Sequence, residues 1–184
     1  MKKDYGYLKL NPKKPVLFLD LDGVLNNCMS STAAWYPETV SRQWFGHDHI
    51  EAHKADLLIS LLKHREAQIV LVSSWVRCYL SAEAVEIMEL KTFFDFDDLK
   101  GSVNTTGGSD RGESVLQCVE FHGLDRWAVL DDADQLYDLT RLGPGRLFAP
   151  HGRYGITDQL LESLDNEALS EAPEEAFVPP WRLS

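Results

Sequence analysis

Apolar runs that end abruptly in polar residues recur along the chain and predict the strands of a sheet. The four predicted strands are Val16–Asp20, Gln68–Ser73, Trp127–Asp131 and Arg146–Phe148. The first three are apolar along almost their whole length, which is typical of parallel strands buried on both faces. A sheet whose strands run in one direction is therefore expected at the centre of the molecule.

The segments between these runs carry the spacing of amphipathic helices. Ile50–Arg65 shows it most clearly, because its apolar residues recur on one helical stripe. The other predicted helices are Ser81–Leu90, Glu113–Phe121, Asp134–Leu139 and Thr157–Leu164. Strands that alternate with helices in this way predict an α/β fold.

Two long connections interrupt the alternation, at Asn27–His49 and Lys91–Asp110. Loops of this length are usually functional or mobile. The first connection contains four aromatic residues, Trp35, Tyr36, Trp44 and Phe45. These side chains either stack a nucleobase or form a small hydrophobic cluster that stiffens the loop, and the sequence allows both interpretations.

The length and charge of the chain limit its organisation and its partners. A chain of 184 residues suits a single domain, predicted over residues 1–165, and residues 166–184, with their acids and prolines, are predicted to form an extended tail. The formal net charge is −11, and from Glu162 onward six acidic residues stand against one arginine. Such a surface gives no general attraction for a polyanion, so a nucleic-acid substrate would have to be bound locally.

The sequence shows no targeting signal and no cysteine pairing. The start, MKKDYGYLKLNPKK, lacks the apolar core of a signal peptide, and no apolar run approaches the roughly 20 residues that span a bilayer. Cys28, Cys78 and Cys118 are widely spaced, as expected of reduced thiols. We therefore expect a cytoplasmic protein that does not contact membranes.

Two aspartates one residue apart end the first predicted strand, in the run VLFLDLDGVLN. Carboxylates as close as those of Asp20 and Asp22 repel each other unless a cation or a proton separates them. Either Mg²⁺ binds here or one of the two acids is protonated. Gly23 allows the chain to turn sharply without a Cβ clash. An ordinary Asp-rich turn after a strand is the alternative explanation.

Polar residues also end the other predicted strands. Ser73 and Ser74 follow one, Asp131 and Asp132 follow another, and Arg111 stands at a predicted helix start after a glycine-rich loop. Because the carboxyl ends of parallel strands meet at one edge of a sheet, we expect these groups to converge. Carboxylates bind Mg²⁺, whereas serine, backbone N–H groups and arginine bind phosphate oxygens. Phosphoryl transfer needs this combination.

Four features in this order resemble the four motifs of the haloacid dehalogenase (HAD) superfamily. They are DLDGV, a strand ending in serine, a basic residue at a helix start and a strand ending in two aspartates. Asp22 resembles its phosphatase branch. More closely, the chain is similar to HAD domains associated with RNA repair proteins and to the 3′-phosphatase domain of phage polynucleotide kinase-phosphatase. The segments that carry this similarity are FLDLDGVLN, SSWVR, RGESV, LDD and GIT. The basic residue is often lysine there and is Arg111 here, so the charge is preserved but the geometry differs.

The resemblance implies a role for each site residue. Asp20 would be the nucleophile that forms an aspartyl-phosphate. Asp22, protonated when substrate binds, would protonate the leaving oxygen and then activate water. The Mg²⁺ ligands would be Asp20, the backbone carbonyl of Asp22 and Asp131, with Asp132 in support. The phosphate-binding residues would be Ser73, Ser74, Arg111 and Gly23.

We therefore expect a Mg²⁺-dependent phosphatase with a Rossmann-like three-layer sandwich and no large cap domain. An open site suits an RNA or DNA end that carries a 3′-phosphate, with separate repair proteins as partners. The alternative is a small-molecule phosphatase such as a 5′-nucleotidase. An alternative of another class is a non-catalytic module that binds phosphate or protein.

Overall fold

The computed structural model describes residues 4–25, 50–73, 90–92, 94–103, 111–151 and 154–170. The described strands are β1 (Val16–Leu19), β2 (Gln68–Leu71), β3 (Leu99–Ser102), β4 (Trp127–Leu130) and β5 (Leu147–Phe148). The α-helices are α2 (Ala52–His64), α4 (Arg111–His122), α5 (Leu139–Leu142) and α6 (Asp158–Leu164). Shorter helical segments are the 3₁₀ turns Gly6–Leu8 and Asp134–Leu136 and the π-helical Asp165–Leu169.

The five strands form one parallel sheet in the order β3-β2-β1-β4-β5. The chain builds outward from β1 through β2 and β3 on one side, and through β4 and β5 on the other. Ligands in such sheets bind beyond the carboxyl ends of the strands, at the position where the strand order reverses. The end of β1 is that position, and the predicted α/β fold is confirmed.

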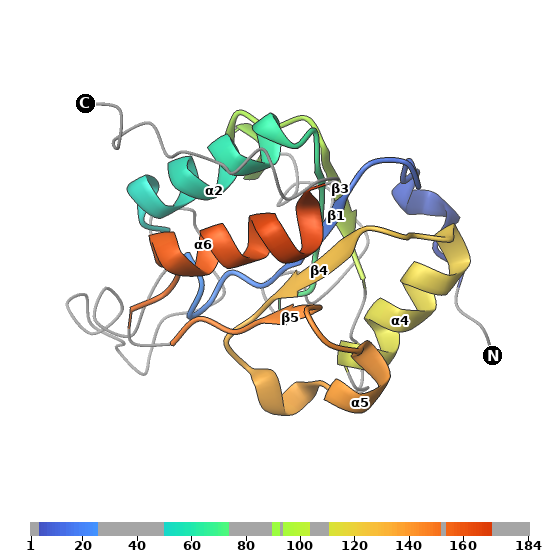
Figure 1. Ribbon diagram of the computed structural model, residues 1–184. Coiled ribbons are helices and arrows are strands. Elements are labelled where there is room, and N and C mark those ends of the chain that lie inside the picture. The colour runs from blue at the N-terminus through green and yellow to red at the C-terminus, as the bar shows by residue number, and fades with distance from the viewer. Residues whose placement is uncertain are drawn as a thin grey trace, which may run out of the picture.

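Helices cover both faces of the sheet, with α2 and α6 on one face and α4 and α5 on the other (Figure 1). Successive strand residues point to opposite faces, so each strand contributes to two cores. Leu17 and Leu19 of β1 belong to the core with α2 and α6, whereas Val16 and Phe18 belong to the core with α4. This explains why the strands read as continuous apolar runs. Within the described residues, no helix is long and apolar enough to cross a bilayer.

Strand β3 lies inside Lys91–Asp110, which the sequence predicted to be a long connection, so that prediction was wrong for Leu99–Ser102. Lys100 and Gly101 interrupt any apolar run there, and Gly101 has a φ of 142°. The register with β2 shifts between Ile69 and Val70, as at a β-bulge. Hydrogen bonding to β2 thus produces a strand where the local sequence favours none.

The helix predicted over Asp134–Leu139 is divided in two. Tyr137 is extended (φ −126°, ψ 131°) between the 3₁₀ turn and α5, and its side chain is buried. Asp138 then caps α5 by accepting a hydrogen bond from the N–H of Thr140. Burial of the tyrosine therefore breaks the helix that the sequence predicted.

The other helix predictions agree with the structure where it describes them. Thr157 caps α6 by accepting a hydrogen bond from the N–H of Leu160. The helix predicted over Glu113–Phe121 is α4, and Gly123 follows it with a φ of +61°. The helix predicted over Ser81–Leu90 lies outside the described residues except for its last position.

The sequence predicts an extended tail from Asn166, but the chain stays helical through Leu169. Leu169 is buried in the core on the α2 side. Asp165 is 1% exposed and accepts two hydrogen bonds from Arg65, with Nε–Oδ1 and Nη2–Oδ2 distances of 2.6 and 2.8 Å. This ion pair fixes the last described helical segment to the end of α2.

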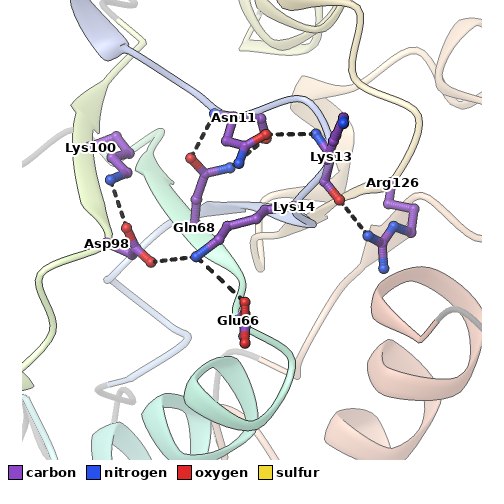
Figure 2. A network of polar contacts seen from close by, with 8 residues as sticks. All are labelled: Asn11, Lys13, Lys14, Glu66, Gln68, Asp98, Lys100 and Arg126. Carbon is purple, nitrogen blue, oxygen red and sulfur yellow. Dashed lines mark hydrogen bonds and ion pairs between the residues drawn. The ribbon is translucent and has the colours of Figure 1, made fainter.

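A polar network closes the edge of the sheet where the strands begin (Figure 2). Gln68, at the start of β2, is buried. Its side-chain Nε2 donates to the carbonyl of Asn11, and its Oε1 accepts from the N–H of Asn11. Lys14, just before β1, forms ion pairs with Glu66 (3.7 Å) and Asp98 (3.5 Å). These contacts hold the starts of β1, β2 and β3 together, at the edge opposite Asp20.

We expect Asp165→Ala to lower the free energy of unfolding by about 3–5 kcal/mol, because it leaves the largely buried guanidinium of Arg65 without its carboxylate. Urea denaturation of the full chain measures this. Asp56→Ala, at an exposed position on α2, is the matched control and should change stability by less than about 0.5 kcal/mol. Equal stability of the two variants would contradict a stabilising role for the pair.

Candidate functional site

The carboxyl ends of β1, β2 and β4 bring three of the predicted site residues to one edge of the sheet. Asp20 directly follows β1, Asp131 directly follows β4, and Ser73 comes two residues after the end of β2. All three are buried, with exposed fractions of 3%, 0% and 4%. The N–H of Asp20 donates to the carbonyl of Leu130 at 2.9 Å, which keeps the ends of β1 and β4 level.

A group of three carboxylates lies at this edge. Asp20, Asp131 and Asp132 each offer an oxygen within 4.8 Å of the other two. Oδ1 of Asp20 is buried and accepts no hydrogen bond from any residue that the structure describes. A buried carboxylate oxygen needs compensation by a hydrogen bond, a proton or a cation. Oxygen ligands are also those that Mg²⁺ prefers, so these residues fit a divalent cation.

Arg111 joins two of these acids. It is the first residue of α4, and its Nη1 lies 3.1 Å from Oδ2 of Asp20 and 2.6 Å from Oδ2 of Asp131. The arginine side chain is only 10% exposed, so the contact is largely shielded from water. One cation therefore holds together two carboxylates that come from different strands and would otherwise repel each other.

Burial and mutual repulsion make the charged state of this cluster unfavourable. Removal from water, followed by the charge of Asp131, raises the pKa of Asp20 to about 6, although Arg111 opposes the shift. Burial, and then the charges of Asp131 and Asp22, raise the pKa of Asp132. A divalent cation would relieve this repulsion, so cation binding and proton release are expected to be coupled.

The turn after Asp20 places a glycine against the carboxylate cluster. The N–H groups of Val24 and Leu25 both donate to the carbonyl of Leu21, and Gly23 has a left-handed φ of +72°. A Cβ on Gly23 would collide with the carboxylate of Asp132, and L side chains rarely adopt this φ, so the turn favours glycine here.

Asp22 lies on the same turn and is partly exposed. Its side chain is not in the group of three carboxylates, but its charge raises the pKa of Asp132. The predicted site residue Ser74 and the aromatic positions 35–45 lie outside the described residues. The structure therefore brings together Asp20, Asp131, Asp132 and Arg111, with Asp22, Gly23 and Ser73 at the same edge.

Tyr137 is a site residue that the sequence analysis missed. Its hydroxyl donates to Oδ2 of Asp131 at 2.6 Å, while the N–H of Ala133 donates to Oδ1 at 2.9 Å. Both oxygens of this fully buried carboxylate are thus held by donors from the segment that follows it. The tyrosine could not be singled out from sequence, because the helix predicted there does not require an inward-facing residue six positions after Asp131.

Comparison with known proteins places the chain in a family. Residues 16–161 match the HAD domain in Swiss Army Knife RNA repair proteins. The chain belongs to this family. The match begins at β1 and includes every site residue described above, so the resemblance to HAD domains of RNA repair proteins is confirmed. The family supports a phosphatase of the HAD type. No curated protein and no solved structure matches the chain.

In the metal-free protein, we expect Asp20→Asn to increase the free energy of unfolding near neutral pH. The pKa of Asp20 is about 6 in the folded protein, above its ordinary value of 3.8. The protonated acid therefore contributes its full stability below about pH 4, and this contribution is lost as the pH rises through 6. An uncharged asparagine avoids that loss, which corresponds to on the order of 3 kcal/mol.

Urea denaturation in EDTA at pH 4.5 and 7.5 tests this expectation. The advantage of Asp20→Asn should be about 3 kcal/mol at pH 7.5 and about a third of that at pH 4.5, where an aspartate in the unfolded chain is already largely ionised. Asp125→Asn, at an exposed position, is the control and should show no such difference. If the advantage of Asp20→Asn were the same at both pH values, the aspartate would not be the group that titrates.

Proposed function

We propose that this protein is a Mg²⁺-dependent phosphatase that hydrolyses a phosphomonoester through an aspartyl-phosphate, with the 3′-phosphate of a nucleic-acid end as substrate. The strongest support is the cluster of two buried carboxylates and one partly buried carboxylate at the ends of β1 and β4, in a chain of the HAD family. One arginine joins the two buried acids. Acids, a cation site and a guanidinium at one edge are suited to phosphoryl transfer.

Asp20 is the nucleophile in this mechanism. Arg111 fixes its carboxylate through Oδ2, so the side chain is oriented before substrate arrives. Attack on phosphorus forms the bond from Asp20 oxygen to phosphorus and breaks the bond to the leaving alcohol. Water then attacks the aspartyl-phosphate, releases inorganic phosphate and restores the carboxylate.

Asp22 moves the protons. As a general acid it gives a proton to the leaving oxygen, and as a general base it takes one from the attacking water, so the residue ends each cycle protonated. Its position two residues after Asp20, on the tight turn of residues 21–25, supports this role. Its partial exposure allows exchange of protons with solvent.

The remaining site residues hold the charges of the reaction. Asp20, Asp131 and Asp132 would hold the Mg²⁺, which supplies positive charge to the phosphoryl oxygens when bound. Arg111 supplies a second, permanent positive charge next to the nucleophile. The residues proposed to bind the phosphoryl oxygens are Ser73, Ser74, Arg111 and the backbone of Gly23.

The nucleic-acid end as substrate rests on the family, because its HAD domains occur in RNA repair proteins. A terminal phosphate on RNA or DNA is a phosphomonoester, which is the bond that this mechanism cleaves. Separate repair proteins are then the partners that we propose. The net charge of −11 implies recognition of the strand end rather than of a long stretch of backbone.

Asp20→Asn should abolish turnover while leaving the protein folded, because an amide cannot form the phosphoryl ester. A phosphatase assay with and without Mg²⁺ measures turnover, and circular dichroism verifies the fold. The wild-type protein should lose activity in EDTA and regain it with Mg²⁺. Turnover by pure Asp20→Asn protein, or wild-type activity that is indifferent to EDTA, would contradict the mechanism.

Substrate class is tested by comparing kcat/KM for a 3′-phosphorylated oligonucleotide with that for 3′- and 5′-mononucleotides. The proposal requires the oligonucleotide to be the better substrate. Preference for a mononucleotide would instead indicate a small-molecule phosphatase such as a 5′-nucleotidase. Failure to hydrolyse any phosphoester would indicate a non-catalytic binding module.

Tyr137→Phe should weaken Mg²⁺ binding by about 10- to 100-fold, because it removes a hydrogen bond that orients a proposed metal ligand. The Mg²⁺-dependent rise in Tm and the Mg²⁺ dependence of turnover measure this independently. Tyr5→Phe is the control, since Tyr5 packs against Phe121 at the far end of α4. Identical Mg²⁺ titrations of the two variants would mean that the tyrosine does not orient Asp131.

A further inference from the structure

A tight turn after β5 carries two aromatic rings at the catalytic edge of the sheet. His151 and Gly155 pair in an antiparallel bridge, and the N–H groups of Tyr154 and Gly155 both donate to the carbonyl of His151. The rings of His151 and Tyr154 lie 5.4 Å apart, centroid to centroid, with an interplanar angle of 40°. Tyr154 is 59% exposed, and His151 is exposed as well.

The turn is fixed to the segment that carries the proposed catalytic residues. The N–H of Ile156 donates to the carbonyl of Val24 at 3.0 Å, and Val24 comes directly after Gly23. Gly155 has a φ of +67°, and a Cβ there would lie 2.5 Å from that same carbonyl. The backbone next to Tyr154 therefore packs directly on the turn that follows Asp20 and Asp22.

A buried lysine holds Tyr154 from the other side. Lys54, on the first turn of α2, is 5% exposed, and its Nζ donates to the carbonyl of Tyr154 at 2.6 Å and to Oε1 of Glu51 at 2.9 Å. Glu51 in turn donates its N–H to the carbonyl of Leu25. Burying an ammonium is unfavourable unless it is paired and hydrogen-bonded, so the two contacts of Lys54 hold the backbone of the exposed tyrosine in place.

The turn that carries the rings contacts Val24, which is close to Asp20 along the chain. Val24 is four residues beyond Asp20, so their Cα atoms are at most about 15 Å apart, and the turn between them shortens this further. A stacked strand advances by about 3.4 Å per nucleotide. A phosphate at Asp20 would therefore leave the last few bases of the same strand within reach of the turn that carries the rings.

We propose that Tyr154, together with His151, forms a stacking platform for a nucleobase near the phosphorylated end of the substrate strand. This inference rests on the proposed function and specifies how the protein binds the substrate strand. Aromatic rings bind any base through its π-face, at about 1–3 kcal/mol per base. Stacking also supplies affinity that does not depend on charge, in a chain whose net charge of −11 repels the phosphate backbone.

Binding to the full-length Asp20→Asn protein tests the platform, since this variant would hold substrate without cleaving it. The probes are fluorescent 3′-phosphorylated oligonucleotides, either with all bases present or with abasic sites at the last three nucleotides, measured by fluorescence anisotropy in Mg²⁺. Adding Tyr154→Leu should weaken binding of the complete strand by about 5- to 150-fold. The same substitution should weaken binding of the abasic strand much less.

Two further variants separate stacking from other effects. Tyr154→Phe keeps the ring and should retain most of the affinity for the complete strand. Phe121→Leu removes another exposed aromatic ring, at the end of α4 opposite Arg111, and should leave binding unchanged. Equal losses for complete and abasic strands, no loss with Tyr154→Leu, or no binding of either strand would overturn the platform.

Turnover of the same oligonucleotides by the protein with Asp20 intact tests the proposed function separately. Turnover combined with binding that does not depend on Tyr154 would overturn the platform alone. Binding that depends on Tyr154 and on the bases, without any turnover, would overturn the phosphatase proposal and still support the platform.

Discussion

The pairing of Arg111 with Asp20 and Asp131 is the interaction on which the organisation of the site depends. The two acids end adjacent parallel strands, so the backbone ladder itself forces their charges together. A single guanidinium reduces the repulsion but leaves an excess of two negative charges when Asp132 is included. One divalent cation would balance that excess, and the buried edge would then be neutral when a phosphate arrives. The fold thus creates an electrostatic imbalance that suits the chemistry we propose.

Much of this arrangement could be predicted from sequence because it follows from topology. Continuous apolar runs identify strands buried on both faces, and parallel strands bring their carboxyl ends to one edge, so the convergence of Asp20, Ser73 and Asp131 needs no long-range information. Arg111 could be placed at a helix start because a glycine-rich loop precedes it. Its contact with both acids, however, depends on how α4 packs on the sheet.

The missed elements depend on tertiary contacts and not on the local sequence pattern. Leu99–Ser102 becomes a strand through its hydrogen bonds to β2, although Lys100 and Gly101 give it no strand pattern. Tyr137 leaves the helix that local spacing predicts, because its side chain is buried against Asp131. The partner of Leu99–Ser102 is distant along the chain. The partner of Tyr137 is reached through a backbone conformation that periodicity does not encode.

The shortness of β5 has a consequence for the dynamics of the site. The N–H of Asp131 donates to the carbonyl of Phe148, the last residue of a strand of only two residues that lies at the edge of the sheet. Short edge segments open more readily than central strands, so local fraying at β5 would release the N–H of Asp131. Amide hydrogen exchange at Asp131 would then be faster than at Asp20, whose N–H bonds to the more central strand β4. The most deeply buried acid of the cluster is thus tied on one side to a strand of only two residues.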